Sequence, residues 1–208
     1  MLDIILISEA LTPELKEMTQ RAIDSVHQST TLEKRIIVVE RTPQNYANAI
    51  VLHDDLPFNY NRLANFAIRY ASADNIIVAN NDVRFLSQSP DILCSTRALV
   101  VSPVDPNGPV SVQGVEFGTQ VGHHFMGWCF LIRRSLWAYL GGFNEDYPFW
   151  YADNVVVDQL KEIGVIPAVN GEAKVRHKVS ATLRHLPSEQ QYQYTTVATH
   201  HYRHRNAS

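Results

Sequence analysis

The stretch Ile76-Ile77-Val78-Ala79-Asn80-Asn81-Asp82 changes abruptly from apolar to polar side chains. A short apolar run of this kind is typical of a strand that is buried on both faces of a parallel sheet. Ligands of open α/β sheets bind beyond the carboxyl ends of the strands. The turn at residues 80–82 is therefore the first place to look for a functional site.

Two similar apolar runs precede this stretch. Residues 4–7 end at Ser8-Glu9, and residues 36–39 end at Glu40-Arg41. Between the runs, Thr12 and Pro13 predict the start of a helix, and the alanines and isoleucine of residues 64–71 predict one face of another. This alternation predicts an α/β fold with a central, mostly parallel sheet flanked by helices.

The second half of the chain is less regular. Residues 129–132 predict a strand, and Ser135 predicts the cap of a short helix that ends at Gly141-Gly142. We expect a further helix over about 153–163 and a strand over 165–169.

Length, charge and cysteine content restrict the possible classes of protein. At 208 residues and a net charge of -3, the chain suits one domain that is not basic throughout. Cys94 and Cys129 are far apart in sequence, which predicts no disulfide framework or zinc knuckle and favours a cytoplasmic setting. No apolar run predicts a signal peptide or a transmembrane segment.

Three segments, in this order, resemble family 2 glycosyltransferases of the GT-A fold. Such enzymes move a sugar from a nucleotide diphosphate to an acceptor with inversion. The segments are Phe58–Asn65 leading into Asn80–Val83, Gly127–Arg134 with Gly141–Glu145 and Tyr151–Asp153, and Val175–His177 with Ser180 and Thr182. The resemblance implies a GT-A domain over 1–185, with a nucleotide-sugar half at about 1–83 and an acceptor half at about 84–185. Residues 186–208 are then a C-terminal extension.

A metal site is part of what the resemblance implies. The family's Asp-x-Asp motif holds a divalent cation, and Asn80-Asn81-Asp82 is similar to it with an amide in place of the first acid. Asp82 is then the metal ligand for Mn²⁺ or Mg²⁺, and His177 matches a second ligand from the C-terminal region. A structural histidine and a simple turn at residues 80–82 remain the alternatives.

The resemblance also implies a catalytic base. Asp153 matches the second acid of the family's Glu-Asp pair, with Ala152 in place of the glutamate, and would take a proton from the acceptor hydroxyl. The alternative is that Asp153 only caps a helix.

Several residues are predicted to bind the nucleotide-sugar co-substrate. Glu40 matches the family's acid that recognises the base, Asn65 is expected to brace the donor loop, and Gly127 to let the backbone approach the sugar. The predicted donor-binding set is Ser8, Glu9, Glu40, Asn65, Asn80, Asn81, Gly127 and Trp128.

The acceptor is open at this stage. A saccharide is favoured, whereas the basic and aromatic residues 200–205 keep modification of nucleic acid bases as an alternative. A non-catalytic module that binds nucleotide sugars is a further alternative, because amides and an alanine replace some of the family's acids. The sequence makes no prediction of oligomeric state.

Overall fold

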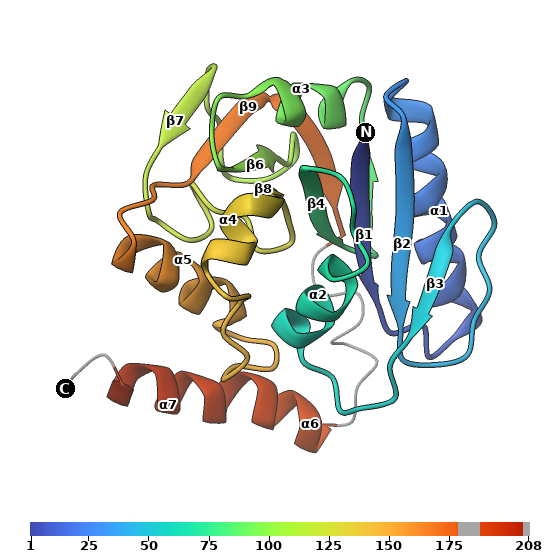
Figure 1. The fold of residues 1–208 in the computed structure, drawn as a ribbon. Helices are drawn as coiled ribbons and strands as arrows, with labels where there is room; N and C mark the ends of the chain where they lie inside the picture. Colours follow the sequence, from blue (N-terminus) through green and yellow to red (C-terminus); the bar gives the residue numbers. More distant parts are fainter. Residues whose placement is uncertain (179–187, 206–208) are drawn as a thin grey trace.

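The computed structural model describes residues 1–178 and 188–205. Ser180, Thr182 and the predicted domain boundary at residue 185 lie outside the described residues. Most of the described chain forms strands and helices, with the helices arranged around the strands (Figure 1).

One sheet organises the chain. Its strands are β1 (Leu2–Ser8), β2 (Lys34–Glu40), β3 (Ile50–His53), β4 (Asn75–Asn80), β5 (Val83–Phe85), β6 (Val100–Val104), β7 (Val115–Phe117), β8 (Cys129–Arg133) and β9 (Ala168–His177). They are ordered β3-β2-β1-β4-β8-β6-β9-β5, with β7 also paired to β9. The first four strands of this order are parallel, and β8 joins them in antiparallel orientation. The prediction of an α/β domain with a central sheet is confirmed.

Helices lie on both faces of the sheet (Figure 1). They are α1 (Pro13–Ser29), α2 (Tyr60–Ile68), α3 (Ser89–Ser95), α4 (Arg134–Tyr139), α5 (Ala152–Glu162), α6 (Ser188–Tyr192), the π-helical turn η2 (Gln193–Val197) and α7 (Ala198–Arg205). The last three run in sequence along one side of the molecule, toward which the carboxyl ends of β1 and β2 point.

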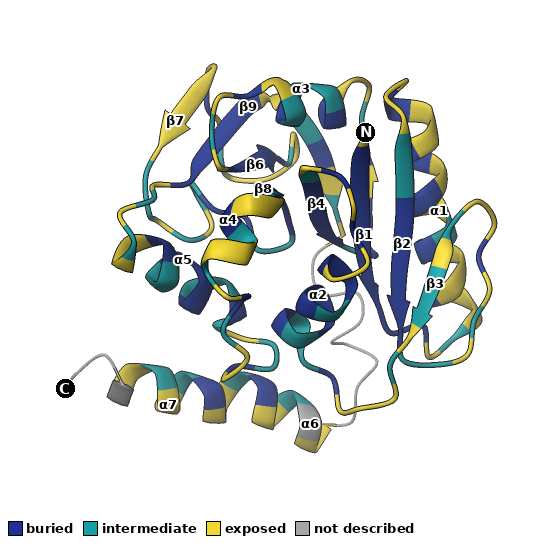
Figure 2. Ribbon diagram, viewed as in Figure 1, coloured by how far each residue is buried: buried dark blue, intermediate teal, exposed yellow. Residues whose placement is uncertain are grey.

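Each face of the sheet has its own core, because side chains alternate along a strand. Ile5 and Ile7 of β1 pack in the cluster that contains α2 and α5, whereas Ile4 and Leu6 pack in the cluster that contains α1. Figure 2 shows the inner strands buried along most of their length and the outer sides of the helices exposed. Burying such a side chain stabilises the fold by roughly 1.5–3 kcal/mol, so a slip of one residue in β1 is disfavoured.

Helix α1 begins where the sequence predicts. Thr12 is its N-cap, and the Thr12 hydroxyl accepts a hydrogen bond from the Leu15 N–H at 3.3 Å. Two other predictions were wrong. Ser135 lies inside α4, whose N-cap is Arg133, and the predicted strand at 165–169 begins only at Ala168 and continues to His177.

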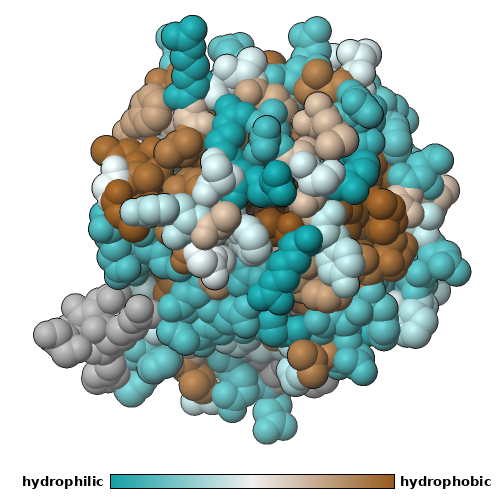
Figure 3. All heavy atoms as spheres, viewed as in Figure 1, coloured by the Kyte–Doolittle hydropathy of each residue, from teal (hydrophilic) through white to brown (hydrophobic). Residues whose placement is uncertain are grey.

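The face of the molecule that is seen in Figure 1 carries both hydrophobic and hydrophilic residues. Figure 3 shows its hydrophobic residues in separate groups between hydrophilic ones. Within residues 1–178 and 188–205, no helix has both the length and the apolar character that a membrane span needs. Both cysteines are free.

Candidate active site

A cavity of about 390 Å³ lies beyond the carboxyl ends of β1 and β4. It is bounded by the ends of these strands, the loop before β8, the start of α5 and the last residue of β9. The polar and aromatic side chains that line it include Glu9, Tyr60, Asn61, Asn80, Asn81, Asp82, Trp128, Trp150, Tyr151, Asp153 and His177. Seven of the predicted site residues with side chains are thus at one cavity, together with the backbone of Gly127, although they come from distant parts of the chain.

Asp82 and His177 face each other at the edge of this cavity. The antiparallel pairing of β5 with β9 places Val83 opposite His177, and the Lys178 N–H donates to the Asp82 carbonyl oxygen at 3.0 Å. Nε2 of His177 lies 3.2 Å from Oδ1 of Asp82 and 3.4 Å from Nδ2 of Asn80. The strand register therefore produces a cluster of three polar side chains.

The Asp82 carboxylate has an unsatisfied oxygen. Oδ1 is buried and accepts no hydrogen bond, since its short contact with His177 lacks hydrogen-bond geometry. A buried carboxylate oxygen without a partner is costly, and a cation would offset that cost. The pair of a carboxylate oxygen with an imidazole nitrogen fits a divalent ion such as Mn²⁺ better than Mg²⁺, which prefers oxygen ligands.

Trp128 holds the histidine in place. Its ring stacks on that of His177 with centroids 4.7 Å apart and planes 11° apart. The Trp128 carbonyl oxygen also accepts a hydrogen bond from the Asn80 N–H at 2.9 Å. The tryptophan therefore connects the end of β4 to the histidine and forms part of the cavity wall.

Asp153 enters the cavity from the first turn of α5. The N-cap of this helix is Tyr151, which adopts a left-handed conformation with φ of 68° that is unfavourable for a tyrosine. Asp153 itself is therefore not the cap, and its Oδ1 accepts the Asn154 N–H at 2.9 Å. Burial raises the pKa of Asp153, opposed by hydrogen bonds from backbone N–H groups.

Gly127 packs directly against Asp153. A Cβ at residue 127 would lie 2.5 Å from Cβ of Asp153 and 3.0 Å from its Oδ2. The Gly127 carbonyl oxygen accepts a hydrogen bond from the Tyr60 hydroxyl at 3.1 Å. Only glycine allows the loop before β8 to lie this close to the start of α5.

Glu40 lies behind the cavity rather than in its wall. Its side chain is fully buried, and its carboxylate accepts hydrogen bonds from the Ser8 hydroxyl at 2.6 Å and the Tyr46 hydroxyl at 2.8 Å. The Ala10 N–H also donates to it at 3.0 Å. Burial, followed by the charge of Glu40, raises the pKa of Tyr46 to about 12. Direct contact between Glu40 and a nucleotide base would require these bonds to break.

Ser8 and Asn81 belong to the same buried network. Nδ2 of Asn81 donates to the Ser8 hydroxyl at 3.1 Å and to the Thr19 hydroxyl at 2.9 Å. Both side chains therefore fix the turns after β1 and β4 in place. Thr19 is a network member that the sequence did not single out, because its position within a helix resembles that of a core residue.

Glu9 does reach the cavity. Its carboxylate forms an ion pair with the Arg41 guanidinium. Burial raises the pKa of Glu9, and the Arg41 charge opposes that rise. Of the two acids at the carboxyl ends of β1 and β2, Glu9 is therefore the one placed to contact a ligand.

Asn65 holds the loop that contains Phe143 and does not line the cavity. Its Oδ1 accepts hydrogen bonds from the Phe143 N–H at 2.8 Å and the Trp137 indole N–H at 3.0 Å. Asn61, which the sequence did not single out, lines the cavity and donates to the Ala152 carbonyl oxygen at 2.9 Å. Asn61 could have been found from its spacing to Asn65 on α2, because residues four apart lie on the same face of a helix.

Aromatic rings connect the C-terminal helices to the cavity wall. Tyr202 of α7 stacks on Tyr151 with centroids 4.4 Å apart, and its hydroxyl donates to Asp158 at 2.9 Å. Tyr194 of η2 stacks on Phe149 with centroids 5.8 Å apart. The segment that was predicted as an extension therefore supports residues that line the cavity.

Comparisons with known proteins agree at the level of fold. No protein-family model matches the chain, and no curated protein matches its sequence. Among solved structures, the mannosyltransferase PcManGT from Pyrobaculum calidifontis, in complex with GDP-Man and Mn²⁺, is similar with a TM-score of 0.65 and 13% identity over 87% of this chain. GalNAc-T7, crystallised with UDP, GalNAc and Mn²⁺, is similar with a TM-score of 0.69 and 9% identity over 96% of this chain.

The chain spans 57% of the length of the first of these proteins and 48% of the second. Their low identity to this chain restricts the comparison to architecture. Within that limit, the comparison agrees with the α/β fold with a central sheet that the sequence predicts. The chain therefore has the GT-A fold of these glycosyltransferases.

Proposed function

We propose that this protein is a metal-dependent glycosyltransferase that moves a sugar from a nucleotide diphosphate sugar to a hydroxyl acceptor. One observation carries the proposal. A buried Asp82 oxygen without a hydrogen bond, the His177 imidazole and the Asp153 carboxylate all meet at one cavity beyond the sheet edge. The two similar glycosyltransferases were solved with Mn²⁺ and a nucleotide or nucleotide sugar, which supports the same ligands here.

Asp82 and His177 would hold the metal ion. A divalent cation supplies charge stabilisation for the departing diphosphate. Trp128 keeps the imidazole in position through its stacked ring. Asn80, whose amide lies 3.4 Å from His177 Nε2, is placed to contact the phosphates or the ribose.

The donor would occupy the same cavity. Glu9 supplies a carboxylate for a hydrogen-bond donor of the base or ribose, and Trp150 supplies a ring against which a sugar or base can stack. We assign Ser8, Asn81 and Glu40 to holding the turns beneath the donor, and Asn65 to holding the loop at residues 142–145. Gly127 lets the loop before β8 lie against Asp153, which sets the position of this acid beside the donor.

Asp153 is the proposed general base. Its carboxylate takes the proton of the acceptor hydroxyl, whose oxygen attacks the anomeric carbon. The bond from that carbon to the phosphate oxygen breaks, and the nucleotide diphosphate leaves with the electron pair. Attack from the side opposite to the leaving group inverts the anomeric centre. A raised pKa makes a carboxylate a stronger base, so burial of Asp153 suits this role.

A saccharide hydroxyl remains the favoured acceptor. The non-catalytic alternative does not explain why Asp153 is buried beside the cavity. A module that only binds a nucleotide sugar does not need an acid with a raised pKa. No geometry at the cavity favours a nucleic acid base as the acceptor. A cytoplasmic location stays a prediction from cysteine content.

A thermal-shift panel tests the proposal. Nucleotide diphosphate sugars are added with and without MnCl₂ to the wild-type protein, to Asp82→Asn and to Asp74→Asn, an exposed control. We expect a shift only with donor and metal together, absent in Asp82→Asn and kept in the control. Saturation at about 100 times Kd stabilises a protein by about 2.7 kcal/mol, which such a panel detects. No shift with any donor, or an equal shift in Asp82→Asn, would overturn the proposal.

A further inference from the structure

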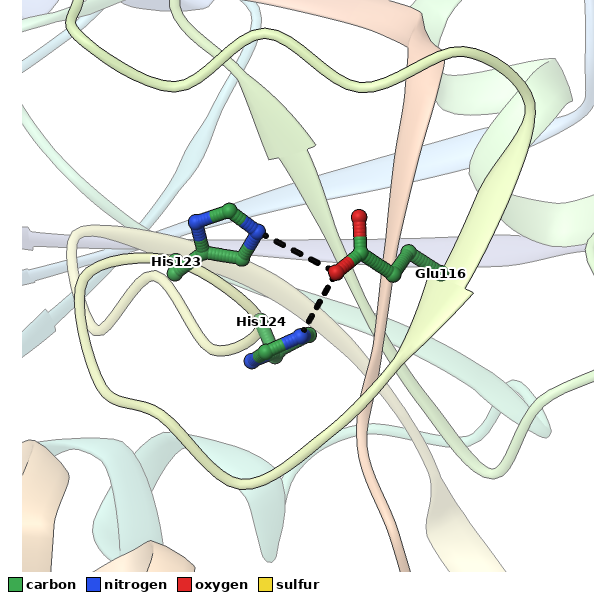
Figure 4. Close-up of side chains that lie close together, drawn as sticks. All are labelled: Glu116, His123 and His124. Carbon is green, nitrogen blue, oxygen red and sulfur yellow. Dashed lines mark hydrogen bonds and ion pairs between the residues drawn. The ribbon is translucent and has the colours of Figure 1, made fainter.

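A second group of metal-binding side chains lies on the surface, away from the cavity. Glu116 of β7 and the adjacent His123 and His124 bring one carboxylate oxygen and two imidazole nitrogens within 4.8 Å of one another. Nε2 of His123 lies 3.4 Å from Glu116 Oε1, and Nε2 of His124 lies 3.0 Å from the same oxygen. Figure 4 shows both rings directed at that oxygen.

We propose that Glu116, His123 and His124 bind a zinc ion, and that the ion fastens residues 118–126 to β7. Zinc takes imidazole and carboxylate ligands at about 2.0–2.2 Å, so ligands of a tetrahedral ion lie about 3.3 Å apart. The separations of 3.4 and 3.0 Å between the two imidazole nitrogens and Glu116 Oε1 are close to that spacing. Two imidazoles with one carboxylate suit zinc better than Mg²⁺ or Ca²⁺.

The backbone holds the three ligands together. β7 is paired with β9, and the Gly118 N–H donates to the Pro167 carbonyl oxygen at 3.1 Å, which fixes the end of the strand. The N–H groups of His123 and His124 both donate to the Gln120 carbonyl oxygen, at 3.2 and 2.8 Å. This turn presents the two histidines side by side.

Gly118 leaves room for the ring of His124. A Cβ at this residue would lie 2.5 Å from ring atoms of His124, so the imidazole rests directly on the glycine backbone. The side chain of His124 is only 14% exposed, although the cluster lies at the surface. A ligand that is already held in place loses little conformational freedom on binding.

Zinc binding has a defined consequence for one proton. In the metal-free protein, Nδ1 of His124 accepts the Gln120 N–H at 3.3 Å, so Nε2 carries the ring proton toward Glu116. A bound zinc ion would take the lone pair of Nε2, so that proton would pass to solvent and Nδ1 would carry the ring proton instead. The hydrogen bond from the Gln120 N–H to Nδ1 would then be lost. The amide resonance of Gln120 is therefore a direct reporter of zinc at this site.

The proposed zinc site lies in the segment that leads to the cavity wall. Residues 118–126 lead directly into Gly127 and Trp128, and Phe125 at the end of this segment is buried in the cavity wall. A zinc ion that joins His123 and His124 to β7 would restrict the segment that carries these residues. This inference does not depend on the proposed glycosyl transfer.

A zinc titration must exclude binding by other histidines. His177 and three closely spaced histidines, His200, His201 and His204, offer further imidazoles. The background protein is therefore the untagged full chain with all four replaced by glutamine. Zinc is titrated against a fluorescent zinc indicator, and Glu116→Gln, His123→Gln and His124→Gln are each added to this background. His27→Gln, an exposed residue of α1, is the matched control.

We expect one zinc equivalent in the background and in the control. Each of the three substitutions should weaken binding by at least about 10-fold, because loss of a group that merely supports a ligand already costs about 10- to 100-fold. Zinc should also move the Gln120 amide resonance and slow hydrogen exchange over residues 118–126 in the background and the control, but not in the three variants. Thermal unfolding of the metal-free variants verifies that they fold. Equal zinc affinity in the background and the three variants would overturn the proposal.

Discussion

Nε2 of His177 lies 3.2 Å from Oδ1 of Asp82, and that oxygen accepts no hydrogen bond. Asp82 directly precedes β5, and His177 is the last residue of its partner strand β9, where the pair reaches the cavity. Two ligand-type atoms held this close without a hydrogen bond are an arrangement that a cation would stabilise.

Replacing His177 with glutamine should weaken Mn²⁺ binding by about 10- to 100-fold, the order of loss found when groups near metal ligands are changed. Isothermal titration with MnCl₂ and a nucleotide diphosphate measures this affinity. The control is His27→Gln on α1, which leaves the cavity unchanged. Equal affinities in the two variants would show that His177 only packs against Trp128.

Asp153→Asn should lower turnover by about 10²- to 10⁴-fold, the contribution typical of a general base. Donor affinity should stay close to that of the wild type, because the amide retains the shape of the carboxylate. Rates of donor turnover with Mn²⁺ measure the loss. Glu162→Gln, an exposed residue on the same helix, should be fully active. An unimpaired Asp153→Asn protein would remove this residue from the mechanism.

The stability of the protein should depend on the ionisation of Asp153. Burial raises the pKa of Asp153 in the folded protein above its value in the unfolded chain, so the folded protein binds this proton more tightly. The associated stability is present below the unfolded pKa and is lost as pH rises through the folded pKa. Denaturant unfolding at several pH values should show this loss in the wild type.

The Asp153→Asn protein cannot ionise at this position and should lack that component. Its free energy of unfolding should therefore rise relative to that of the wild type as pH rises. Activity depends on pH in the opposite direction, because the base works only when deprotonated. A parallel pH dependence of stability in both proteins would contradict the buried-acid assignment.

Gly127→Ala should reduce activity because its Cβ would lie 2.5 Å from Cβ of Asp153, an atom anchored to the backbone of α5. Overpacking of this kind costs about 1–3 kcal/mol and displaces the acid. Gly122→Ala in the same loop is the control. It has φ of 78° with open space around it, so it should cost stability of about 1–2 kcal/mol without loss of activity. Equal activity in both variants would contradict this account.

Tyr202→Ala should destabilise the fold by about 1–3 kcal/mol, because it removes the ring stacked on Tyr151 and the hydroxyl bonded to Asp158. Tyr151 lines the cavity, so KM for the donor or acceptor should rise as well. Tyr192→Ala removes an exposed tyrosine of the neighbouring helix and should change neither quantity. Chemical denaturation and steady-state kinetics measure both effects, and unchanged KM in Tyr202→Ala would separate α7 from the site.

The inner strands could be predicted because they are buried on both faces and therefore contain continuous apolar runs, at residues 4–7 of β1 and 76–79 of β4. Short or exposed strands could not. The three residues of β7 are all exposed, and only their pairing with β9 makes them a strand. Ser135 was assigned as a cap from residue type alone, whereas the chain leaves β8 directly into α4 at Arg133. The C-terminal helices lack a strong apolar period, since they bind the domain through a few aromatic rings.

Asn80-Asn81-Asp82 illustrates the division between sequence and tertiary structure. The local sequence by itself determined a buried strand followed by a polar turn, because burial and turn formation depend on neighbouring residues. The sequence also indicated Asp82, His177 and Asp153 as candidates. Only the tertiary structure decided that Asn81 bonds to Ser8 and Thr19, that Glu40 lies behind the cavity, and that Asp82 faces His177. Those contacts depend on strand register and on burial by distant segments, which no local pattern specifies.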